Sequence, residues 1–275
     1  MGSTSQETPR RRDTTLTFIS GGSGGIGKSG NARALAALLG HHGHHVVLVD
    51  GNPGQQSQRR WHALDDTSML ENAQWLGQLG KALIMPRQLG QTYALLPGPA
   101  DPLAPGMNDL YGKALYMLKS IPATDPGHVD AIIVDTDRID QTLWEQKGSF
   151  ANHVIRPFMQ AGLASMIFRL GQTGSQTGDG LRALAAVNMP GQVCATVQAP
   201  ATLAKPRTDS EWKRILAPVA RYAGCDRWSP DSLAEQQPGT RLDPPVTDWL
   251  CRQAAFIGFH IEPEQRKGHS WFHHR

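Results

Sequence analysis

Short apolar runs alternate with longer stretches of mixed polarity along most of this sequence, and the alternation predicts the fold. Six runs of five or six residues are rich in apolar and β-branched side chains, which is typical of buried strands. They occupy residues 15–20, 45–50, 92–96, 130–135, 164–168 and 192–197. Strands that alternate with helices indicate an α/β domain, in which a mostly parallel, twisted sheet carries helices on both faces.

Helices are expected at 31–39, at 108–120 and from about 245 to 257. The helix at 108–120 has an amphipathic pattern whose apolar side holds Leu110, Ala114, Leu115 and Leu118. Residues 200–245 are rich in proline and polar side chains, and no element is predicted there.

A glycine-rich run between the first predicted strand and the first predicted helix satisfies the P-loop pattern G-x-x-x-x-G-K-[ST]. In such a loop the glycines let backbone N–H groups turn inward around an anion, and the positive end of the helix faces it. Lys28 would reach the β- and γ-phosphates of a nucleotide, and the Ser29 hydroxyl would ligate Mg²⁺. The alternative, a plain glycine-rich linker, fits less well with a strand before the run and a helix after it. The predicted nucleotide-binding residues are Gly22, Ser23, Gly24, Gly25, Ile26, Gly27, Lys28, Ser29 and Gly30.

Two aspartates end predicted strands and are candidates for the metal site. Asp135 ends the strand at 130–135, where a P-loop NTPase needs a carboxylate that orients Mg²⁺ through its water shell. Asp50 ends the strand at 45–50 in the same way and is the next candidate. The alternative for either residue is an ordinary aspartate that caps a turn.

Three segments, in the same order, resemble the ParA/MinD group of P-loop ATPases. Residues 23–29 resemble the deviant Walker A loop K-G-G-x-G-K-[ST] of that group. Residues 46–57, with Trp61 shortly after, resemble its second motif D-x-D-P-Q-x-S, and residues 130–136 resemble its Walker B strand. The resemblance covers residues 14 to about 137. It implies ATP and Mg²⁺ as ligands, a nucleotide-dependent homodimer, non-specific DNA binding and a small DNA-binding adaptor protein, in plasmid or mobile-element partition, maintenance or positioning.

The sequence departs from that group at two positions that the group uses for hydrolysis. Ser23 stands where the group has a lysine that reaches the phosphates of the partner subunit, and a neutral hydroxyl does not stabilise charge on the transferred phosphoryl group. Asn52 stands where the group has a second aspartate, and an amide can hold the attacking water but not accept its proton. With Lys28, Asp50 and Asp135 retained, we expect nucleotide binding with slow or absent hydrolysis. Arg138 or Arg169 could replace the missing cation in space.

Composition sets the limits of the domain. The sequence of 275 residues has 39% hydrophobic residues, and no apolar run approaches the roughly 20 residues that cross a bilayer. We expect a disordered basic tail at 1–13, a ParA-like P-loop domain at 14–260 and a basic, histidine-rich tail at 261–275. The three cysteines are far apart and form no C-x-x-C pair, so neither a zinc site nor an iron–sulfur site is indicated. A reducing compartment is expected. A cytoplasmic or nucleoid-associated location is therefore expected, without export.

Two kinds of cluster are weaker signals. Four histidines, at 41, 42, 44 and 45, suggest a metal site, but a surface turn is the better interpretation. Arginine and lysine pairs or triplets at 10–12, 59–60 and 266–267 are candidate DNA contacts, with a solvated surface as the alternative. A net charge of +3 adds little to the DNA hypothesis.

Two further functions stay open at this point. The P-loop could serve assembly alone, in a non-hydrolysing, nucleotide-stabilised interaction protein, and the residues at 23 and 52 favour that interpretation. A P-loop small-molecule kinase is the other alternative, but no arginine-containing lid motif is evident in the sequence.

Overall fold

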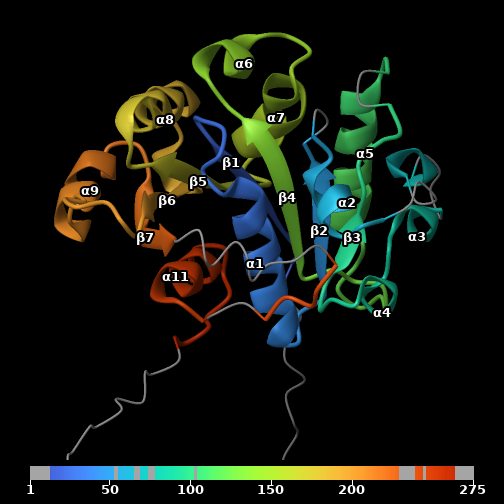
Figure 1. The fold of residues 1–275 in the computed structure, drawn as a ribbon. Coiled ribbons are helices and arrows are strands. Elements are labelled where there is room, and N and C mark those ends of the chain that lie inside the picture. The colour runs from blue at the N-terminus through green and yellow to red at the C-terminus, as the bar shows by residue number, and fades with distance from the viewer. Residues whose placement is uncertain are drawn as a thin grey trace, which may run out of the picture.

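A parallel β-sheet forms the centre of the protein (Figure 1). The computed structural model describes residues 13–52, 55–64, 69–73, 78–101, 104–228, 239–243 and 246–263. In these residues seven strands pair in the order β3-β2-β4-β1-β5-β6-β7, and every neighbouring pair is parallel. The strands are β1 (Thr15–Gly21), β2 (Val46–Gly51), β3 (Ala94–Leu96), β4 (Ala131–Arg138), β5 (Ser165–Gly171), β6 (Val193–Pro200) and β7 (Arg221–Trp228).

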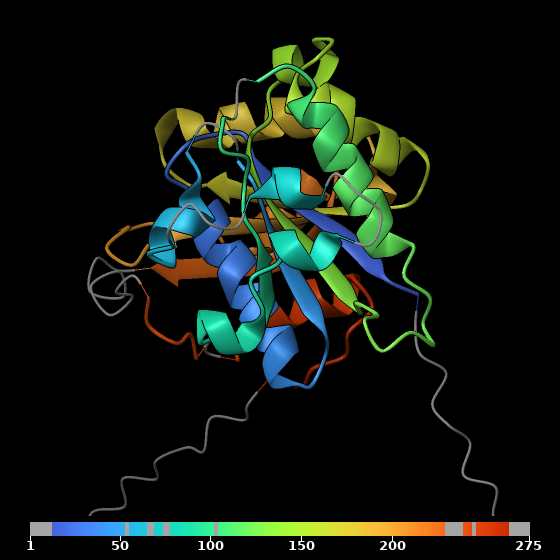
Figure 2. The ribbon, with the colours of Figure 1, turned by 90° about the vertical axis from the view of Figure 1, so that its right-hand side faces the viewer.

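Helices connect the strands and cover both faces of the sheet (Figures 1 and 2). They are α1 (Lys28–His41), α2 (Ser57–Trp61), α3 (Leu79–Ala82), α4 (Pro86–Leu89), α5 (Met107–Lys119), α6 (Gln141–Glu145), α7 (Arg156–Gln160), α8 (Gly174–Val187), α9 (Asp209–Leu216) and α11 (Asp248–Phe256). Short 3-10 helices lie at Leu70–Ala73 and Pro190–Gln192, and a π-helical turn at Ala151–Ile155 leads into α7.

Two apolar cores lie on opposite faces of the sheet, because side chains alternate between the faces along each strand. One core joins the sheet to α5, α6, α7, α8 and α9, and it contains Phe18 and Phe168. The other joins the sheet to α1, α4 and α11, and it contains Ile19 and Ile167. The predicted α/β class, with a parallel sheet and helices on both faces, is confirmed.

All six predicted strands are present within a few residues of their expected bounds, and so are the three predicted helices. The segment 200–245, for which no element was predicted, contains α9 and β7. The charged tails proposed at 1–13 and 261–275 fall almost wholly outside the described residues. Among the described residues, no helix is both long enough and apolar enough to cross a membrane.

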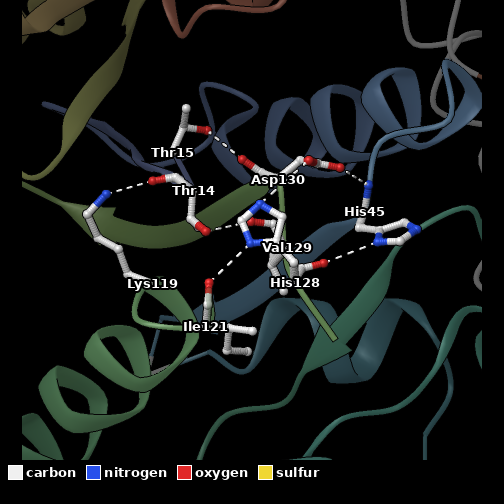
Figure 3. A network of polar contacts seen from close by, with 8 residues as sticks. All are labelled: Thr14, Thr15, His45, Lys119, Ile121, His128, Val129 and Asp130. Atoms are coloured by element: carbon white, nitrogen blue, oxygen red, sulfur yellow. Dashed lines mark hydrogen bonds and ion pairs between the residues drawn. The ribbon is translucent and has the colours of Figure 1, made fainter. Parts of the chain in front are cut away.

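The amino ends of the central strands are tied together by polar contacts, at the edge opposite the P-loop (Figure 3). Lys119, the last residue of α5, donates to the carbonyl of Thr14 at 2.6 Å, and the Thr14 hydroxyl donates to the carbonyl of Val129 at 2.7 Å. The backbone N–H of His45 donates to the Asp130 carboxylate at 2.7 Å. These contacts fix where β1, β2 and β4 begin, and so where their carboxyl ends meet.

The histidine run lies at this same edge, far along α1 from the P-loop. His41 is exposed and lies 3.7 Å from the Asp243 carboxylate, and the ring of His44 packs 4.6 Å from that of Phe259. His45 is exposed, and its Nδ1 contacts a backbone carbonyl. Within the part of the chain that the structure describes, there is no group of three or more His, Cys, Asp or Glu placed to hold a metal ion.

Candidate nucleotide and metal site

The P-loop runs from the end of β1 at Gly21 to the start of α1 at Lys28, and three of its glycines are required by its shape. Gly25 and Gly27 have φ values of 68° and 73°, in the left-handed region that glycine adopts without strain. A Cβ on Gly22 would lie 2.6 Å from the Cα of Gly180 in α8, so only glycine lets the loop pass that helix. The sequence therefore builds the loop where ligands bind in parallel α/β folds, at the carboxyl ends of the strands.

Lys28 follows the loop as the first residue of α1, and its side chain turns back into the loop. Its side chain is largely buried, and Nζ donates to the carbonyl of Ser23 at 2.9 Å. Burial lowers the pKa of Lys28, while the nearby Asp137 and Asp135 carboxylates oppose that change. The Ser23 hydroxyl is itself buried and has no hydrogen-bond partner among the described residues. Because the Ser23 hydroxyl is neutral and buried, Ser23 would supply no cation to a partner subunit.

The two strand-end aspartates lie side by side. Asp50 and Asp135 are register partners in the parallel pair β2 and β4, and both are completely buried. Burial, followed by repulsion from Asp135, raises the pKa of Asp50 to about 7, although backbone N–H groups partly offset the change. Burial also raises the pKa of Asp135, and hydrogen bonds from Ser29 and Gln58 oppose it. Two buried acids held side by side favour a bound cation.

Unused acceptors mark where such a cation fits. Asp50 Oδ1, Asn52 Oδ1 and Asp135 Oδ1 are all buried, and none has a hydrogen-bond partner among the described residues. Buried carboxylate and amide oxygens normally have donors or metal ions as partners. Mg²⁺ prefers oxygen ligands of this kind. The donor set at this edge, with the Ser29 hydroxyl beside it, therefore fits Mg²⁺.

Gln58, in α2, joins both aspartates and was missed by the sequence analysis. Its Nε2 donates to Asp135 Oδ2 at 2.7 Å and to the carbonyl of Ser29 at 3.3 Å. Its backbone N–H donates to Asp50 Oδ2 at 3.1 Å. Gln58 is completely buried. A helix of five residues is too short for a periodic pattern that would show which side faces inward, so periodicity did not single out this residue.

Arg33 is a second residue that the sequence did not single out. It lies one helical turn after Ser29 in α1, with only 9% of its surface exposed. Its Nη1 donates to Gln58 Oε1 at 3.2 Å, and its guanidinium lies 4.5 Å from the centre of the Trp61 ring. An open hollow of about 500 Å³ beside Ser29 is lined by Arg33, Trp61 and the exposed Arg60. A buried cation thus lies close enough to Asp135 and Asp50 for their charges to act on it.

The two arginines considered as replacements for the missing lysine differ in position. Arg169, in β5, is buried under the loop, where Nε donates to the carbonyl of Ile26 at 3.2 Å and Nη2 pairs with Asp226 at 2.6 Å. Arg138 ends β4 as the register partner of Gly21, is exposed, and lowers the pKa of Lys28 by its charge. Arg169 contacts the loop from inside the protein, whereas Arg138 is exposed at the end of β4.

The arginine pair proposed as a DNA contact is only half exposed. Arg59 is 5% exposed, its backbone N–H donates to Asp50 Oδ2 at 3.3 Å, and its Nη2 contacts the sulfur of Met69 at 3.1 Å. The proposal for Arg59 was therefore wrong, because α2 turns this side chain into the protein. Arg60 points to solvent. The basic residues at 10–12 and 266–267 lie outside the described residues.

No protein-family model and no curated protein matches the sequence. Solved structures do match along most of the chain. A chain of the MinC:MinD cell division protein complex of Aquifex aeolicus has a TM-score of 0.61 and 18% identity, with 91% of this chain and 99% of that chain covered.

Two nucleotide complexes are also similar. A putative plasmid partition protein of Borrelia burgdorferi bound to AMPPNP has a TM-score of 0.58 and 16% identity, over 89% of this chain and 96% of that one. The septum site-determining protein MinD of Pyrococcus horikoshii, complexed with Mg-ADP, has a TM-score of 0.57 and 17% identity, over 89% and 93%. The fold is thus the α/β P-loop NTPase fold of the MinD and ParA proteins, as the motifs predicted.

Proposed function

We propose that this protein is an ATP-binding switch of the ParA/MinD type. The observation that carries the proposal is a group of three buried oxygens, on Asp50, Asn52 and Asp135, that have no hydrogen-bond partner among the described residues. They lie beside the P-loop residues Lys28 and Ser29. Such oxygens are stabilised when a cation is held against them. The backbone of residues 22–30 and the Lys28 ammonium would hold the phosphates, and Ser29, Asp50 and Asp135 would hold Mg²⁺, directly or through water. Bound Mg²⁺ would neutralise phosphate charge and polarise the γ-phosphoryl group.

Hydrolysis is expected to be slow. Ser23 offers no positive charge, and its hydroxyl faces inward. Asn52 is buried at the position where the attacking water would be oriented, and its amide can bind that water without accepting a proton. Arg138 is exposed and near enough to Lys28 for its charge to lower the pKa of that lysine, and we propose it as the residue that supplies positive charge within the same subunit.

The biological role that we propose is partition, maintenance or positioning of a plasmid or mobile element. ATP would stabilise a face-to-face homodimer whose affinity for DNA and for a small DNA-binding adaptor differs from that of the monomer. A second candidate is a nucleotide-stabilised interaction protein without turnover. The neutral residues Ser23 and Asn52 favour this second candidate, because both lack the charge that hydrolysis uses.

Two measurements on the purified protein separate these functions. Steady-state phosphate release is measured with and without DNA, and the molar mass is measured by light scattering with ADP or a non-hydrolysable ATP analogue, always with Mg²⁺. The switch proposal predicts slow release that Lys28→Ala abolishes, and a doubled mass with the analogue. Doubled mass without release would support the interaction protein. If the protein neither releases phosphate nor changes its molar mass, both candidate functions are refuted.

A further inference from the structure

Arg33 places a positive charge inside the protein next to the proposed metal site. It follows Ser29 by four residues in α1, so the two side chains share one face of the helix, and helical side chains tilt toward the N-terminus. The guanidinium is therefore directed back toward Ser29. Asp135 and Asp50 are among the groups whose charge acts on Arg33 most strongly. Arg33 and Lys28 together can balance the two buried carboxylates when no metal is bound.

Gln58 lies between Arg33 and the carboxylate of Asp135 and bonds to both. Its amide nitrogen lies between Asp135 Oδ2 and the carbonyl of Ser29, at 2.7 and 3.3 Å, and its amide oxygen accepts from Arg33 at 3.2 Å. Gln58 thus links the Arg33 guanidinium to the Asp135 carboxylate through two hydrogen bonds. An amide N–H aimed at a carboxylate occupies a direction from which a cation would otherwise approach.

We propose that Arg33 and Gln58 are positioning residues that hold the metal site closed until a nucleotide arrives. A divalent cation alone must approach two resident cations, Arg33 and Lys28, and one oxygen of Asp135 is already occupied by the Gln58 amide. A nucleotide brings the negative phosphate charges that offset this repulsion. The inference rests on the proposed function, since it takes Asp50 and Asp135 as the metal-binding acids. According to this inference, Arg33 and Gln58, which belong to no P-loop motif, make the metal ion bind with or after the nucleotide.

A metal ion bound to Asp135 would also act on α2, because Gln58 links that carboxylate to the helix. Gln58 and Trp61 belong to the same helix of five residues, and Trp61 is the aromatic partner of Arg33. The carbonyl of Trp61 in turn accepts from the backbone N–H of Gly239 at 2.8 Å. Metal binding should therefore change the fluorescence of Trp61, and a Trp61→Phe variant isolates that contribution from the other tryptophans.

Mn²⁺ is the probe for the test, because its free concentration is read directly by electron paramagnetic resonance. The variants are Arg33→Met, which removes the charge at similar length, Arg33→Lys, which keeps it, and Gln58→Met, which removes the amide. Arg60→Met is the matched control, because Arg60 lines the same hollow but is exposed. Each protein is titrated without nucleotide and with a non-hydrolysable ATP analogue.

Without nucleotide, we expect Arg33→Met to bind Mn²⁺ at least about tenfold more tightly than the wild type, the effect of removing one nearby charge in a partly buried site. Gln58→Met should shift affinity in the same direction, and Arg33→Lys and Arg60→Met should match the wild type. Equal affinity in wild type and Arg33→Met refutes the inference. If Arg33→Met does not fold, Gln58→Met decides in the same way. Absence of Mn²⁺ binding to wild type even with the analogue refutes the proposed function instead.

Discussion

Replacing Asp50 by asparagine should stabilise the protein at alkaline pH when no metal is present. Asp50 is completely buried, and its ordinary pKa of 3.8 is raised to about 7. Because the folded state binds the proton more tightly than the unfolded chain, this group adds stability below pH 3.8 that is lost as the pH rises through about 7. The difference between the two pKa values corresponds to about 4 kcal/mol at about 1.4 kcal/mol per pH unit.

Asparagine has nearly the shape of the protonated acid, and its Oδ1 can still accept from the backbone N–H groups of Gln58 and Arg59. Asp50→Asn should therefore match the wild type within about 1 kcal/mol near pH 4 and exceed it by roughly 2–4 kcal/mol near pH 8. With Mg²⁺ and an ATP analogue the order should reverse, because only the carboxylate offers a full charge to the cation.

The assay is urea unfolding followed by circular dichroism, with EDTA present, at both pH values. Glu145→Gln is the control, because Glu145 is an exposed carboxylate of α6, for which a change of about 0.5 kcal/mol or less is expected. A variant that is less stable than the wild type near pH 8 would refute the assignment of Asp50 as a strained, metal-seeking acid.

Two further predictions concern the support of the P-loop. Gly22→Ala should destabilise the protein by about 1–3 kcal/mol, because the added Cβ meets the backbone of Gly180 at 2.6 Å, whereas Gly24→Ala enters open space and should leave the melting temperature unchanged. Equal melting temperatures for the two variants would contradict the close approach to α8. Arg169→Met should lower the affinity for an ATP analogue about tenfold and stability by about 2 kcal/mol, because Asp226 and the Ile26 carbonyl lose their donor. Calorimetric titration and thermal unfolding measure both effects, and Asp226→Asn affecting neither would weaken this account of Arg169.

The sequence predicted the centre of the fold and the loop because these depend on local signals. The strand at 130–135 is apolar almost throughout, and the P-loop needs only its glycines, Lys28 and Ser29 in a row. The positions of Asp50 and Asp135 at strand ends predicted that both lie at the same edge of the sheet. Their contact depends on the register of β2 with β4, which single-sequence patterns do not give.

The missed elements have a physical reason. β7 is an edge strand whose exposed and polar residues hide the expected alternation. α9 begins with a capping box in which Thr208 and Glu211 bond reciprocally, and the sequence T-x-x-E could have shown it. Arg33 and Gln58 gave no signal at all, because a buried arginine and a buried glutamine are recognised only from their partners.

Binding of a non-hydrolysable ATP analogue with Mg²⁺, measured by isothermal titration calorimetry, tests the central claim most directly. The account predicts one site per chain in the wild type and a loss of affinity of about 100-fold in Lys28→Ala, since a charge-assisted contact contributes about 1.5–3 kcal/mol and the loop loses its resident cation. Thermal unfolding of Lys28→Ala would verify that it folds. Absence of binding to the wild type, or equal binding by a folded Lys28→Ala, would contradict the assignment of residues 22–29 as the phosphate site.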